Sequence, residues 1–317
     1  MTSASAEPSD SWSCANSRRA AAMSPAAAVR WLLLGLVGLV DWGWMKWAGF
    51  HIGPGFTETI AVIAVLIAVA LFYFYTDGDE RLMEFAHFGA QYVGLYAVMM
   101  PLSFLAVSTN APLVDGAFDA IDKALGLDWV AWTRWVGVHP LLHWGFVVVY
   151  GSLPVQQLFC YIHNLHSSAN WKNREMWWIT FVSGLVTIAA SAAFPASDPY
   201  VYYGLAPADH FLHVQDFLGL RDGTMHVIGY TDTQGLVQLP SFHTIVAIML
   251  TYNLRHHRWL FAAALALNVA VILSCPTEGN HYFIDIFGGG TVAAATIWAV
   301  RAVHGRFELP RLGVVAG

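Results

Sequence analysis

The class of fold is clearest in WLFAAALALNVAVILSC (residues 259–275) and HYFIDIFGGGTVAAATIWAVRA (residues 281–302), two runs that the turn PTEGN joins. Each run is nearly free of charge and comes close to the roughly 20 residues that a helix needs to cross a hydrocarbon core of about 30 Å. The whole chain has this character, since 57% of its 317 residues are hydrophobic and 11% are charged. A soluble domain has about 25% charged residues. The sequence therefore predicts an all-α, polytopic membrane helix bundle.

Similar apolar runs recur along the chain and predict about eight transmembrane helices. They lie at residues 31–49, 57–75, 83–106, 140–162, 176–194, 240–254, 259–275 and 281–302. Eleven of the fifteen Lys and Arg residues then fall on the side of both termini, which the positive-inside rule places in the cytoplasm. We expect residues 1–25 to be a disordered cytoplasmic tail and residues 26–310 to be a single transmembrane domain. The short loops favour a bacterial inner membrane.

Charge and cysteine content exclude several classes of partner and cofactor. The net charge is −6 and no basic tract suggests nucleic acid. The three cysteines, Cys14, Cys160 and Cys275, have neither the spacing of a zinc site nor that of a disulfide framework. We therefore expect no metal and no cofactor.

Two further segments suggest structure outside the spans. Residues 113–129, LVDGAFDAIDKALGLDW, alternate apolar and charged residues at helical spacing. This pattern predicts either an amphipathic helix on the membrane surface or a surface helix that covers the bundle. In DHFLHVQD (209–216), His210 and His213 with Asp209 or Asp216 have zinc-binding side chains, but the spacing fixes no third ligand.

Two polar motifs stand at the outer membrane boundary, at residues 238–244 (QLPSFHT) and 274–285 (SCPTEGNHYFID). Their histidines, His243 and His281, are separated by two helical crossings of about 18 residues each, which return the chain to the same membrane face. We therefore expect the two histidines to be neighbours on the extracytoplasmic side.

The second motif places a carboxylate beside its histidine. Asp285 follows His281 by four residues, so the two side chains share one face of a helix. A buried aspartate needs a partner, and the imidazole N–H would be that partner. The other ring nitrogen would then be free as a nucleophile or base. Alternatively, the two side chains only serve as hydrogen-bond partners for each other inside the bundle and have a structural role. Gly288 and Gly289, one turn further along, would allow close packing of a partner helix.

The first motif has the residues of an anion site. Pro240 suits the first position of a helix because it has no N–H group to leave unpaired. The free N–H groups of that turn and the Ser241 hydroxyl would bind an anion beside His243. The alternative is a helix that begins with a proline and has an interfacial histidine.

PSFH (240–243) followed by HYFID (281–285) resembles the type 2 phosphatidic acid phosphatase superfamily, whose second motif reads P-S-x-H and whose third ends H-x-x-x-D. The branch of inositol phosphorylceramide synthases and their bacterial relatives is the most similar. FPASDPY (194–200) is also similar to a Phe-Pro-containing stretch of that branch. The resemblance covers about 194–290 and implies a six-helix phosphatase-like core.

The chain departs from the superfamily pattern in two places. Ser274 is followed by Cys275 where the phosphatases have a phosphate-binding arginine, and the first motif, K-x6-R-P, is absent. Arg221, in LRDGTMH, is the replacement candidate; otherwise it is an ordinary loop arginine. These departures weaken the case for a plain phosphatase more than the case for a phosphotransferase.

The resemblance and the residues together imply a membrane-embedded lipid phosphatase or phosphotransferase. His281 would attack phosphorus to form a phosphohistidine, Asp285 would orient it, and His243 would protonate the leaving oxygen. Ser241 and Arg221 would hold the phosphoryl oxygens. The partners would be a phospholipid or other lipid phosphate and, as acceptor, ceramide or another lipid hydroxyl. With water as acceptor, the protein would be a simple lipid phosphate phosphatase.

A function from another class is a proton-coupled transporter. Ionisable residues inside a membrane often relay protons or bind a solute. Asp41, Glu84, His143 and Asp285 would form that relay.

Overall fold

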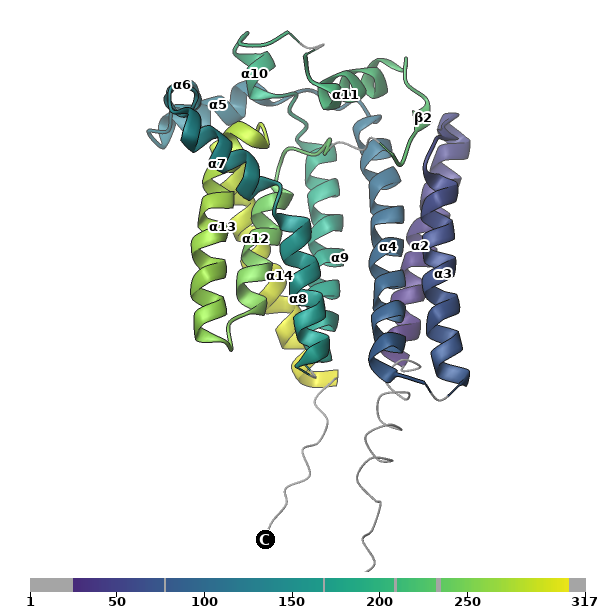
Figure 1. The fold of residues 1–317 in the computed structure, drawn as a ribbon. Helices are drawn as coiled ribbons and strands as arrows, with labels where there is room; N and C mark the ends of the chain where they lie inside the picture. Colours follow the sequence, from purple (N-terminus) through teal and green to yellow (C-terminus); the bar gives the residue numbers. More distant parts are fainter. Residues whose placement is uncertain (1–24, 77, 168, 208–209, 232–234, 308–317) are drawn as a thin grey trace, which may run out of the picture. The chain divides into compact units, whose positions relative to one another are not determined.

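Helices make up 77% of the computed structural model, which describes residues 25–76, 78–167, 169–207, 210–231 and 235–307 (Figure 1). This confirms the predicted all-α, polytopic helix bundle. The contacts within the chain divide it into two compact units. Residues 1–24, which include most of the expected cytoplasmic tail, lie outside the described residues.

Unit 1 contains α2 (Pro25–Ala48), α3 (Phe56–Tyr75) and α4 (Glu80–Val107) as far as Pro101. It also contains β1 (His51–Ile52), which pairs in parallel with β2 (Val227–Ile228). No residue of α3 is buried. An apolar helix of which no residue is buried in protein is suited to lipid contact over most of its surface.

Unit 2 contains the remaining helices. Its longer helices are α7 (Pro140–Tyr150), α8 (Leu153–His166), α9 (Asn170–Ala193), α12 (Phe242–Asn253), α13 (Arg258–Glu278) and α14 (Phe283–Phe307). Its other helices are α5 (Asp115–Ala124), α6 (Trp129–Gly137), α10 (Pro199–Tyr202) and α11 (Leu212–Asp222). These four lie together at one end of the longer helices (Figure 1).

Six helices of the described chain are long and apolar enough to cross a membrane: α2, α3, α4, α9, α13 and α14. The pair α7 and α8, bent by 43°, makes a seventh span if it is counted as one. Each of these corresponds to an expected span. The protein is therefore an integral membrane protein by the length and composition of its helices.

The remaining expected span, residues 240–254, is α12, which has only 12 residues. At 1.5 Å per residue it is about 18 Å long, too short for a hydrocarbon core of about 30 Å. It packs against α8, α9, α13 and α14, and most of its residues are buried. Because α12 is surrounded by other helices, its first turn lies inside unit 2 and not at an exposed helix end.

The amphipathic segment at 113–129 forms a helix, but its polar face is turned inward. In α5 the buried residues are Asp115, Phe118, Asp119 and Asp122. Ile121, in contrast, is 41% exposed. The carboxylates, not the aliphatic side chains, therefore face the rest of unit 2, where α5 contacts α14.

Candidate active site

The first motif forms the beginning of α12. Ser241 is the N-cap residue, and its Oγ accepts a hydrogen bond from the Thr244 backbone N–H at 3.4 Å. The helix begins at Phe242, so Pro240 precedes the N-cap and the expectation that it occupies the first helical position is wrong. The physical reason is that a serine hydroxyl caps a helix by bonding to a free N–H group of its first turn.

The second motif forms the beginning of α14. His281 lies just before the helix and Asp285 lies in its first turn. The Nδ1 atom of His281 is 3.3 Å from Oδ2 of Asp285, and the same oxygen accepts the Tyr282 backbone N–H at 2.9 Å. Both side chains are buried. With Nδ1 facing the carboxylate, Nε2 is the ring nitrogen available for nucleophilic attack.

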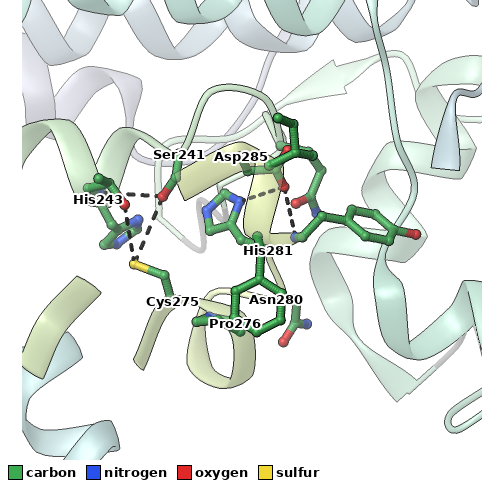
Figure 2. A network of polar contacts seen from close by, with 12 residues as sticks. Ser241, His243, Cys275, Pro276, Asn280, His281 and Asp285 are labelled. Carbon is green, nitrogen blue, oxygen red and sulfur yellow. Dashed lines mark hydrogen bonds and ion pairs between the residues drawn. The ribbon is translucent and has the colours of Figure 1, made fainter. Parts of the chain in front are cut away.

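The backbones of the two motifs are joined directly. The Ser241 N–H donates to the Asp285 carbonyl at 2.9 Å, so the first turns of α12 and α14 touch. The glycines of α14 make this approach possible, because a Cβ at Gly288 would lie 3.0 Å from Leu239 and a Cβ at Gly289 only 2.6 Å from the Ser241 carbonyl oxygen. Figure 2 shows Ser241, His243, His281 and Asp285 gathered in one place.

A tyrosine of α7 contacts His243 and the turn before His281, and nothing in the sequence indicates it. The Tyr150 hydroxyl is 3.0 Å from Nδ1 of His243, and the two rings stack with centroids 4.2 Å apart. At Gly279, a Cβ would lie 2.6 Å from the Tyr150 hydroxyl and 2.9 Å from Cδ2 of His281. Tyr150 thus lies beside Nδ1 of His243 and reaches the turn before His281.

Cys275 takes the place of the arginine in the superfamily pattern. It is fully buried, and its sulfur lies 3.9 Å from the Ser241 hydroxyl and 3.8 Å from the Thr244 hydroxyl. Among the described residues, the hydrogen bonds and ion pairs of Ser241, His243, His281 and Asp285 involve no lysine or arginine.

Arg221 makes none of the hydrogen bonds or ion pairs that the structure shows for the two histidines among the described residues. It lies in the last turn of α11, where its Nη2 donates to the Ala111 carbonyl at 2.7 Å. Its guanidinium also lies over the Phe217 ring, 5.2 Å from the ring centroid. Arg221 is therefore held by neighbours that have no part in the two motifs.

Several residues that hold the turn before α14 have no signal in the sequence that predicts this role. The Trp129 indole N–H lies 3.1 Å from the carbonyl oxygens of both Pro276 and His281. Asn280, which has a positive φ of 52°, donates to Oδ2 of Asp198 at 2.7 Å. Asp198 lies in the FPASDPY segment, whose resemblance to a family branch did not predict this contact.

The zinc site considered at residues 209–216 does not form among the described residues, where no three His, Cys, Asp or Glu side chains are placed to hold a metal ion. His213 instead bonds to Asp198, with Nε2 2.9 Å from Oδ2. Asp209 lies outside the described residues.

The residues of the hypothetical proton relay have other neighbours. Nε2 of His143 is 3.6 Å from a carboxylate oxygen of Glu278, while Asp285 is paired with His281. Asp41 and Glu84 belong to unit 1. Within unit 2, His143 and Asp285 therefore take part in two separate ion pairs.

Replacing Gly289 by alanine is expected to separate the two motifs. The added methyl would meet the Ser241 carbonyl at 2.6 Å and Thr244 Cβ at 2.9 Å, so α12 has to move. Overpacking of this kind costs about 1–3 kcal/mol. We expect a lower apparent Tm and little remaining activity, measured on the purified variant. Gly290→Ala is the matched control, since its methyl would find its nearest neighbour at 4.0 Å; equal effects in both variants would contradict the prediction.

Comparison with known proteins assigns the chain to a family. A family model described as the PAP2 superfamily matches residues 117–299, which include both histidine motifs. No curated protein and no solved structure matches the chain. The PAP2 superfamily has a phosphatase-type activity on lipid phosphates. Because the family model covers more than half of the 317 residues, the chain belongs to the PAP2 superfamily.

Proposed function

We propose that the protein is a lipid phosphotransferase that works through a phosphohistidine on His281. The observation that carries the proposal is the meeting of the first turns of α12 and α14, which gather His243, Ser241, His281 and Asp285. The set contains a nucleophile, a carboxylate that orients it, and a second histidine for proton transfer.

In the first half-reaction, Nε2 of His281 attacks phosphorus, and the bond from phosphorus to the leaving oxygen breaks. Nε2 of His243 donates its proton to that oxygen. Asp285 stabilises the positive charge that develops on His281. In the second half-reaction, an acceptor hydroxyl gives its proton back to His243 and its oxygen attacks phosphorus. The phosphorus–nitrogen bond breaks and His281 is regenerated.

The absence of cationic contacts in the described site favours transfer of a phosphodiester head group. A phosphomonoester carries a charge of about −1.5 to −2 at neutral pH, because its second pKa is about 6. A phosphodiester carries a single negative charge. With Cys275 where the superfamily pattern has arginine and with Arg221 held elsewhere, N–H groups and hydroxyls would bind the phosphate. Such a site is better matched to one charge than to two.

The proposed acceptor is a lipid hydroxyl, such as that of ceramide, as the resemblance to the inositol phosphorylceramide synthase branch suggests. The test uses the purified protein in nanodiscs with phospholipids labelled at the head-group phosphate. Ceramide, diacylglycerol or no acceptor is added in separate samples. We expect labelled phosphate to move to an added lipid hydroxyl faster than to water. Release of free phosphate from phosphatidic acid, with no transfer to either acceptor, would make the protein a simple phosphatase.

We further propose that both termini are cytoplasmic and that the site opens on the other side of a bacterial inner membrane. The distribution of Lys and Arg supports this orientation. The accessibility of single cysteines to a membrane-impermeant reagent in intact cells tests it, in a background without the native cysteines. A cysteine at exposed position His210 is expected to react and one at exposed position His256 is not; the reverse pattern would invert the topology.

A further inference from the structure

The inward face of α5 has three aspartates, of which Asp115 and Asp122 contact the second motif. Asp115, Asp119 and Asp122 are spaced by four and three residues, which places them on one side of a helix. All three are buried. Asp115 accepts the Tyr282 hydroxyl at 2.9 Å. Asp119 instead accepts hydrogen bonds from Lys123 and the Tyr203 hydroxyl.

Asp122 bonds to the N-terminus of α14 with both carboxylate oxygens. Its Oδ2 accepts the Phe283 N–H at 2.8 Å, and its Oδ1 accepts the Ile284 N–H at 2.8 Å. The first N–H groups of a helix have no partner within the helix itself. Asp122, about 160 residues earlier in the chain, supplies the acceptors at this end of α14. At the start of α12, the N-cap residue Ser241 itself supplies the acceptor.

We propose that Asp122 is a positioning residue for the reaction: from α5 it caps the N-terminus of α14 and so holds His281 and Asp285 in the geometry for attack. The proposal rests on the function proposed for His281. The capped groups lie between these two residues, since His281 precedes Phe283 and Asp285 follows Ile284. A shift of about 1 Å in such a site costs about 100-fold in rate.

The charge of Asp122 gives this role a pH dependence. Burial raises the pKa of Asp122 to about 6, and the carboxylates of Asp285 and Asp119 add to the effect, although the two backbone N–H groups oppose it. Tyr203 is a further titratable group that faces it. Only the carboxylate form accepts both N–H groups with two unprotonated oxygens, so the cap weakens as the pH falls below about 6.

The contribution of Asp122 to fold stability changes with pH in the direction opposite to the strength of the cap. The pKa of Asp122 in the folded protein, about 6, exceeds the value of 3.8 expected of an unperturbed aspartate. Its contribution to stability is therefore fully present below 3.8 and is lost as the pH rises through about 6. A positioning role predicts that activity increases over the pH range in which this stability contribution declines. A merely structural role predicts that both decline together.

The experiment compares Asp122→Asn and Asp122→Ala with Asp119→Asn, the matched control on the same face of α5. Head-group turnover by the full-length wild type is the reference. We expect Asp122→Asn to lower kcat by about 10-fold or more, with KM nearly unchanged, and to remove part of the acid limb of the pH profile. Its apparent Tm should be unchanged or higher at pH 5. Asp122→Ala should lose more activity, and Asp119→Asn should keep kcat within about threefold.

Hydrogen exchange separates the cap from the chemistry. We expect backbone amides at 283–284 to exchange faster in Asp122→Ala than in wild type, and at the wild-type rate in Asp119→Asn. Unchanged exchange in Asp122→Ala overturns the cap whatever the activity. Faster exchange with wild-type kcat, or a loss of activity that only follows the loss of stability, overturns the positioning role. If the wild type turns over no lipid phosphate, the proposed function is wrong. The exchange rates then still show whether Asp122 caps α14.

Discussion

His281→Gln is expected to abolish turnover, lowering kcat by about 10⁴-fold or more, as removal of a covalent nucleophile does in other enzymes. Glutamine lacks the nucleophilic ring nitrogen but keeps an amide N–H that can donate to Asp285. The buried carboxylate is therefore not left without a partner. The measurement is the rate of phosphate transfer or release from labelled phospholipid by the purified variant.

The control for this prediction is His210→Gln, because His210 is exposed and lies in the segment before α11, outside both motifs. It should retain the wild-type rate. If His281→Gln keeps more than about 1% of the activity while its apparent Tm is that of the wild type, His281 is not the nucleophile.

Asp285→Asn is expected to lower kcat by about 10³–10⁴-fold, by analogy with the loss seen when the aspartate of a catalytic triad is amidated. The amide still offers an oxygen to the Tyr282 N–H, which Oδ2 of Asp285 accepts at 2.9 Å. The neutral amide has no negative charge, however, with which to stabilise a positive charge on His281. The measurement is kcat/KM together with the apparent Tm.

Stability distinguishes the catalytic from the structural role of Asp285. The carboxyl group is fully buried, and burying a charge is costly, whereas the isosteric neutral amide keeps an oxygen that can accept the Tyr282 N–H. We therefore expect Asp285→Asn to unfold at the same temperature as wild type or higher. An activity within about 10-fold of wild type would indicate that the His281–Asp285 hydrogen bond has only a structural role inside the bundle.

The sequence is sufficient to predict features that depend only on residues close together in the chain. Apolar length predicts the spans, because crossing the hydrocarbon core requires a minimum number of residues wherever the helix packs. The four-residue spacing of His281 and Asp285 predicts their contact, although His281 lies just before the helix and not inside it. The glycines at 288 and 289 predict a close helix partner. These expectations needed no knowledge of which other segment lies nearby.

The sequence was not sufficient where the partner comes from a distant segment. The alternation in α5 does not say which face is buried, and the common expectation is that the apolar face is. Here the aspartates turn inward because Tyr282, Phe283 and Ile284 offer donors that need acceptors. Tyr150 was missed for the same reason, since nothing in the α7 sequence indicates that a histidine 93 residues later will stack on it.

The most direct test of the central claim is detection of a phosphohistidine at position 281. Wild type, His243→Ala and His281→Gln are incubated with phospholipid carrying labelled phosphate and are denatured in alkali, which preserves phosphohistidine, before peptide mapping. We expect acid-labile label on the peptide that contains His281 in the wild type. We expect none in His281→Gln. In His243→Ala, which lacks the group that activates the acceptor, label that forms should persist for longer. Turnover by the wild type with no label on that peptide at any time, or with label on another residue, would contradict the claim.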